Sequence, residues 1–223
     1  MKRFVFRSLA VVAVASYFAA NAFSEVERHP DKRAYFGETH MHTAYSLDAY
    51  LGGTRQTPSD AYRFAKGESV VLNGKPHRLR RPLDFATVTD HAEYLGEMYA
   101  AFHPESEAHQ IYEIQQLVGL ADMNERRQWF LKYVVGNTRG GKPSHLPFYP
   151  GNDVARQGWK VVIDAAQEHN QPGVFTAFIG YEWTSAPKGA NLHRNIIYRS
   201  NSVPEQIVSS FEIPREEALW QWL

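Results

Sequence analysis

Apolar and polar positions follow two different periods along the chain, and this pattern predicts strands that alternate with helices. Two segments, 83–89 and 174–183, are nearly continuous in apolar and β-branched residues, as the buried strands of a parallel sheet are. Shorter strands are predicted at 34–40 and 192–199. Because the intervening segments have helical spacing, we expect an α/β fold with a parallel sheet.

Helix start and stop signals divide the segments between these strands. Pro58, followed by Ser59 and Asp60, begins a short predicted helix that ends at Gly67. Helical spacing also runs from Glu93 to about Val135. The remaining expectations are breaks at Pro104 and Gly119, a hairpin over 69–79 with Asn73-Gly74 as its turn, a helix from Asp153 to about 170, a turn at 187–189 and a helix from Pro214.

The first 22 residues have the composition of a secretory signal peptide. Lys2, Arg3 and Arg7 precede an apolar run over 9–20, and Ala20-Asn21-Ala22 fits a cleavage site. The run is shorter than the roughly 20 apolar residues that a membrane-spanning helix needs, so cleavage is expected to leave no stable membrane anchor. We therefore expect a periplasmic or secreted bacterial protein, with a flexible segment over 23–33 and one domain over 34–223.

Composition narrows the available chemistry to imidazole and carboxylate groups. The 24 basic and 24 acidic residues balance, so no basic surface is predicted and we expect no nucleic-acid partner. The absence of Cys excludes a thiol nucleophile, a disulfide framework and a thiolate metal site. The ten His residues are the strongest nitrogen ligands that remain.

Histidines and carboxylates stand at the same edge of the predicted sheet. His40 and His42 share a face because side chains alternate along a strand, and Asp48 on the following loop is a candidate ligand or a partner for an imidazole N–H. A carboxylate at the end of an apolar strand, as Glu182 is, needs a cation: a metal ion, or a Lys or Arg at the rim. The full set comprises His40 and His42 after the first strand, Asp90 and His91 after the second, Glu182 at the end of the third and His193 at the start of the fourth.

Imidazoles with a bridging carboxylate suit two or three divalent ions of zinc, manganese or iron. Such ions activate water, which indicates a hydrolase with Glu182 and Asp90 as candidate catalytic residues. We expect a small-molecule substrate, foremost a phosphoester whose charge is neutralised by Arg55, Lys188 or Arg194. Two alternatives remain: hydrolysis of an amide, lactone or carboxylic ester on the same site, and a non-catalytic barrel that binds a metal or ligand. For Asp90 and His91, a helix cap with a surface histidine is the simpler interpretation.

The order of these motifs resembles that of the PHP (polymerase and histidinol phosphatase) metal-dependent hydrolases. The motifs are His40-x-His42 with Ser46 and Asp48, Thr89-Asp90-His91, Gly180-x-Glu182, and His193. More narrowly, the segments 35–43, 88–93 and 179–183 are similar to domain-of-unknown-function family 3604.

The resemblance implies a distorted (β/α)7 barrel with a di- or trinuclear metal site at its C-terminal rim. It implies that the metal ligands are His40, His42, His91, Glu182 and His193, with Glu182 bridging two ions and with Asp48 and Asp90 as further candidates. The same pattern includes a late Asp-x-His, and this sequence has no His beyond position 193. Because only four core strands are predicted, we expect the barrel to be incomplete at the C-terminus of this chain.

Overall fold

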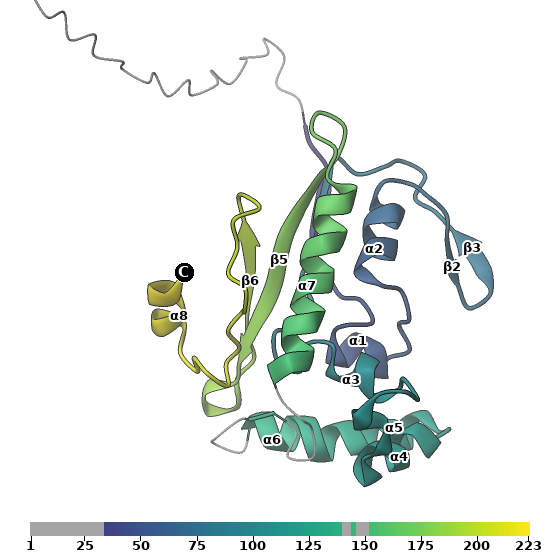
Figure 1. Ribbon diagram of the computed structural model, residues 1–223, viewed down its shortest axis with the longest axis vertical. Helices are drawn as coiled ribbons and strands as arrows, with labels where there is room; N and C mark the ends of the chain where they lie inside the picture. Colours follow the sequence, from purple (N-terminus) through teal and green to yellow (C-terminus); the bar gives the residue numbers. More distant parts are fainter. Residues whose placement is uncertain (1–33, 140–143, 146–151) are drawn as a thin grey trace, which may run out of the picture. The chain divides into compact units, whose positions relative to one another are not determined.

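A curled four-stranded sheet organises the chain (Figure 1). Its strand order is β1 (Gly37–Met41), β4 (Phe85–Val88), β5 (Thr176–Ser185) and β6 (Leu192–Tyr198). The first three strands run parallel, and β6 runs antiparallel to β5. A separate two-stranded sheet of β2 (Val70–Leu72) and β3 (Lys75–His77) confirms the predicted hairpin, whose turn residues Asn73 and Gly74 both have positive φ.

The structure is a computed structural model that describes residues 34–139, 144–145 and 152–223. The predicted signal peptide over 1–22 and the segment 23–33 lie outside the described residues. Within the described ranges, no helix is both long enough and apolar enough to cross a lipid bilayer.

The predicted helices are confirmed, and some are shorter than expected. The helix predicted from Pro58 begins with a capping box in which Thr57 and Asp60 bind each other's backbone N–H groups. The long helical segment is divided close to Pro104 and Gly119, as expected. The α-helices are α1 (Leu47–Leu51), α2 (Pro58–Ala65), α3 (Glu97–Ala101), α4 (Tyr112–Gly119), α5 (Met123–Phe130), α6 (Gly136–Arg139), α7 (Asn152–His169) and α8 (Glu216–Trp222). Short 3₁₀ segments η1 (Glu107–Gln110) and η3 (Pro187–Gly189) and a π-helical turn η2 (Leu131–Val135) complete the elements.

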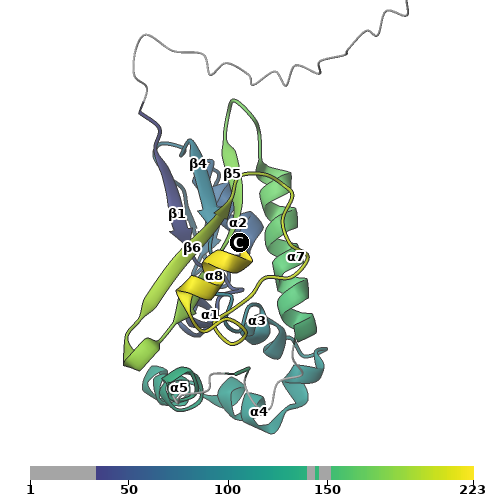
Figure 2. The same ribbon diagram turned by 90° about the vertical axis from the view of Figure 1, so that its left-hand side faces the viewer.

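Two apolar clusters hold these elements together. The larger one packs α2, α7 and α8 against the sheet, with Tyr62, Trp159 and Trp183 fully buried at its centre. The smaller one joins α1 to the helices α3 to α5. These helices lie at the end of the sheet toward which β1 and β4 point (Figure 2). The carboxyl ends of β1 and β4 therefore point toward helices α1 and α3 to α5.

The prediction of a distorted (β/α)7 barrel is wrong. The described residues form a half-barrel sheet of four strands and a small antiparallel sheet, without a closed ring of parallel strands. The fourth strand also departs from the expected parallel arrangement. Only residues 186–191 separate β5 from β6, whereas a parallel return requires a crossover of a dozen or more residues. The short connection allows only an antiparallel β6.

Gly180 in β5 permits the close approach of strands inside the curl. A Cβ atom at this position would lie 2.5 Å from Thr87 Cγ2 on β4 and 2.7 Å from the carbonyl oxygen of Ile196 on β6. Across the curl, the side-chain amide of Asn195 on β6 donates a hydrogen bond of 2.9 Å to the carbonyl oxygen of Thr39 on β1. The two outer strands of the sheet are thus linked at the end that carries the histidines.

We expect Gly180→Ala to lower the free energy of unfolding by about 1–3 kcal/mol, because the new methyl group meets a backbone carbonyl that cannot rotate away. Thermal unfolding followed by circular dichroism measures the loss. Gly119→Ala is the matched control, since a Cβ atom there meets nothing within 4 Å. Equal stability of the two variants would contradict this role of Gly180.

Candidate metal centre

Four strand ends bring imidazole and carboxylate groups into one cluster, as the sequence predicts. His40 lies in β1 and His42 just after it, while Glu182 lies in β5. His91 follows β4 and forms an isolated parallel bridge with Glu182. His193 pairs with Thr184 in the antiparallel register of β5 and β6, so His193 and Glu182 share a face of the sheet.

Strand β1 has an irregularity at His40, the first histidine of the cluster. The pairing of β1 with β4 shifts between Glu38 and Met41, where β1 has one more residue than its partner. The backbone N–H groups of Thr39 and His40 donate to the carboxylate of Glu38, each at 2.9 Å. Glu38 therefore supplies the hydrogen bonds that the interrupted ladder leaves open.

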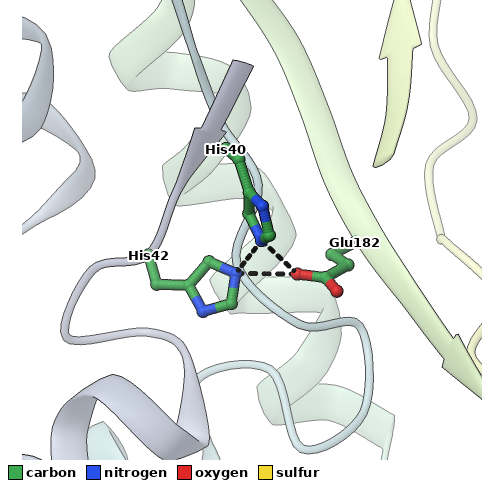
Figure 3. A group of neighbouring side chains, drawn as sticks. All are labelled: His40, His42 and Glu182. Carbon is green, nitrogen blue, oxygen red and sulfur yellow. Dashed lines mark hydrogen bonds and ion pairs between the residues drawn. The ribbon is translucent and has the colours of Figure 1, made fainter. Parts of the chain in front are cut away.

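Three overlapping groups of side chains in the described residues could hold a metal ion. In the first group, His40 Nε2 and His42 Nε2 lie 3.0 and 2.7 Å from the same carboxylate oxygen of Glu182, and 3.2 Å from each other (Figure 3). Three ligand atoms that converge at this spacing surround a common point, which is the arrangement that a bound cation needs.

The second group joins Glu182 to His91 and His193. His193 Nδ1 contacts Glu182 Oε1, and His91 Nδ1 lies 3.9 Å from Glu182 Oε2. The hydroxyl of Thr184 lies between the two rings, 2.9 Å from His91 Nδ1 and 3.1 Å from His193 Nδ1. Oxygen Oε2 of Glu182 thus faces His40, His42 and, at a longer distance, His91, while Oε1 faces His193. The two oxygens face different imidazoles, which is the geometry of a bridging ligand.

The third group consists of Asp48, His42 and His91. Both carboxylate oxygens of Asp48 lie 3.2 Å from His42 Nδ1, and one lies 3.7 Å from His91 Nε2. These are not the nitrogens that face Glu182. Asp48 therefore either orients the two rings through their outer nitrogens or binds an ion there itself. The hydroxyl of Ser46 donates to Asp48 at 2.6 Å and accepts from the backbone N–H of His91 at 3.3 Å.

Charge balance in the cluster depends on histidine alone among the described residues. The ion pairs of the fully buried Glu182 are all with imidazoles, and none is with Lys or Arg. Burial raises the pKa of Glu182, but the hydrogen bond from His42 and the charges of the surrounding imidazoles outweigh it and lower the pKa to about 2. Burial likewise lowers the pKa of His42, and its hydrogen bonds to Asp48 and Glu182 raise it to about 10.

Asp90 is separate from this cluster. Its two carboxylate oxygens accept hydrogen bonds from the backbone N–H and the hydroxyl of Thr43, at 2.5 and 2.7 Å. Asp90 is buried, and burial raises its pKa to about 6. These contacts join the segment after β1 to the end of β4, so Asp90 holds two ligand-bearing segments together.

The three predicted substrate-binding cations lie in different surroundings. Arg55 donates to the carbonyl oxygens of Tyr50 and Thr54 and stacks on the Tyr50 ring. Arg194 follows His193 on the strand, so it belongs to the opposite face of the sheet. Lys188 lines a cavity beside the cluster. Arg55 and Arg194 are not part of the lining of this cavity.

The site contains two further polar residues, Thr184 and Glu93, that are not among the predicted ones. Thr184 stands two positions after Glu182 in a strand, and this spacing alone could have placed it on the same face. Glu93 is buried, and burial raises its pKa. It accepts hydrogen bonds from the backbone N–H groups of Thr184 and Ser210 at 3.1 and 2.7 Å. No local pattern marks Glu93, because its partners are distant in the sequence.

Fold and site together define an α/β protein with a cluster of histidine and glutamate side chains that could bind metal. The model of one family, described as Protein of unknown function (DUF3604), matches residues 29–223. The chain belongs to this family, which confirms the similarity noted in its sequence motifs. Neither the curated proteins nor the solved structures contain a significant match.

We expect Glu182→Gln to weaken the binding of Zn²⁺ or Mn²⁺ by more than the roughly 10–100-fold loss typical of removing a residue that only orients a ligand. The substitution keeps the shape of the side chain but removes the charge that both pairs of imidazoles share. Calorimetric titration of the metal-free protein measures the change. Glu97→Gln is the matched control, because Glu97 is equally buried and bonds to His145 outside the cluster. A similar loss in both variants would contradict the assignment.

The stability of the metal-free protein should fall as the pH rises from about 6.5 to about 10. Folded His42 keeps its proton up to about pH 10, whereas the ordinary value is 6.5, so its stabilising contribution is complete below pH 6.5 and is lost through this window. Melting temperatures measured across the window test the expectation. His42→Gln should flatten the slope, and the exposed His77→Asn should leave it unchanged. An undiminished slope in His42→Gln would refute the assignment.

Proposed function

We propose that this protein is a metal-dependent hydrolase related to the PHP hydrolases, with two or three divalent ions at the Glu182 cluster. The observation that carries the proposal is the position of the Glu182 carboxylate, of which Oε2 faces His40 and His42 while Oε1 faces His193. A carboxylate placed in this way can bridge two ions, and paired ions are a recurring device of hydrolytic enzymes.

The donor set fits zinc, manganese or iron. All of its members are imidazole nitrogens or carboxylate oxygens, which these metals accept, and the chain has no Cys to favour a thiolate site. His40, His42, His91, Glu182 and His193 would hold the ions, with Asp48 as a further ligand or as the residue that orients His42. This support comes from the chemistry and convergence of the side chains.

Bound divalent ions would supply the Lewis acidity that makes water nucleophilic at neutral pH. The chain itself contributes a fixed frame for the reaction. Glu182 is held by hydrogen bonds on both oxygens, and Asp90 fixes the segment that carries His42 through its bonds to Thr43. For the proposed phosphoester substrate, a water oxygen joins phosphorus as the ester P–O bond breaks. The departing alcohol takes the proton that the water loses.

We also propose a cellular location and a class of partner for this protein. The signal-like composition of residues 1–22 supports export to the periplasm or beyond, and the balanced charge supports small molecules over nucleic acid as partners. Both statements rest on the sequence.

The test is hydrolysis by the full chain loaded with Zn²⁺ or Mn²⁺. We expect release of phosphate from p-nitrophenyl phosphate, at a rate that Glu182→Gln and His40→Ala each reduce by at least about 10–100-fold. Glu97→Gln again serves as the control. Turnover of p-nitrophenyl acetate, a lactone or an amide, but not of the phosphate ester, would show that the substrate is a carboxylic ester, lactone or amide and not a phosphoester. Full metal occupancy without turnover of any of these compounds would instead indicate a binding protein.

A further inference from the structure

A cavity lies beside the cluster. The cavity has a volume of about 610 Å³, within the range of small-molecule sites. Asp48, His91, His193 and Thr184 line it, whereas His40 and His42 do not. A ligand in this cavity would therefore meet the cluster from the side of the second group of imidazoles.

Part of the remaining lining is an apolar and partly aromatic wall. Leu47 of α1 contributes to it, together with Phe130 at the end of α5 and Val134 in the π-helical turn. Pro187 and Pro214 complete this surface from two loops. A wall of this composition stabilises a carbon-rich part of a ligand, and an aromatic ring matches it in size and shape.

Among the described residues that line this cavity, one side chain carries a permanent positive charge. It is Lys188, which is exposed and takes part in no ion pair within the described part of the chain. Its φ of 53° places it in the left-handed region, at the tight turn between β5 and β6. The two carboxylates of the lining are already engaged: Asp48 by His42 and Ser46, and Glu93 by backbone N–H groups. The cavity can therefore accept an anion near Lys188.

We infer that the cavity receives small anionic esters that carry an aromatic group, of which aryl phosphates are the simplest. The negative group would be drawn to the cluster and to Lys188, and the ring would lie against the wall of Phe130 and Val134. This inference rests on the proposed metal-dependent function. It adds a substrate class and gives Phe130 the role of selecting substrates with an aromatic group.

Equilibrium binding of two phosphonates, which cannot be hydrolysed at phosphorus, tests the inference on the zinc-loaded full chain. Phenylphosphonate should bind about tenfold more tightly than methylphosphonate, because only the former has a ring to bury. Phe130→Ala should remove most of this difference while leaving the affinity for methylphosphonate unchanged. Phe102→Ala is the matched control, because Phe102 packs against the same apolar cluster without lining the cavity.

Lys188→Gln should weaken both phosphonates by a similar factor, about threefold to fivefold for a single exposed charge. Lys160→Gln is the control, since Lys160 lies on α7 and pairs with Asp164 away from the cavity. Equal binding of the two phosphonates, no effect of Lys188→Gln, or no phosphonate binding to the metal-loaded protein would each overturn the inference. Failure to load metal at all would overturn the proposed function as well, so metal analysis before titration separates the two failures.

Discussion

The burial of the Glu182 carboxylate is the constraint on which the arrangement of the site depends. A carboxylate removed from water is strongly destabilising unless cations and hydrogen bonds surround it. Among the described residues those cations are imidazoles, brought from β1, the end of β4 and β6. Because an imidazole, unlike Lys or Arg, is also a good metal ligand in its neutral form, the same side chains can balance Glu182 as cations or bind a metal once they lose their protons.

The curl of the sheet is what makes this convergence possible. In a flat sheet of this strand order, β1 and β6 would be separated by two strands, at about 14 Å, and Thr39 and Asn195 could not be joined by a hydrogen bond. Gly180 lets Thr87 and the Ile196 carbonyl approach β5, and Asn195 ties β6 to the Thr39 carbonyl of β1. The cluster and the curl therefore support each other: the glycine admits the bend, and the charged groups hold the strand ends that the bend brings together.

Local patterns in the sequence predicted the strands and the residues at their ends, because strand alternation and helix caps are properties of neighbouring residues. They placed His40, His42, His91, Glu182 and His193 at one edge, and the structure brings these five together. Long-range features were beyond such patterns. The orientation of β6 depends on the length of the turn before it, and the isolation of Asp90 depends on Thr43, which is 47 positions away. The sequence predicts a loop where α1 lies, because five residues are too few to show a helical period.

The imidazoles around the Glu182 carboxylate differ in their access to the cavity, and this difference decides which of them a bound ligand would meet. His40 and His42 do not line the cavity, whereas Asp48, which contacts both His42 and His91, does. The group of His91 and His193 does line it, with only the Thr184 hydroxyl between the rings. A ligand that enters the cavity would therefore meet the imidazoles of His91 and His193 before those of His40 and His42.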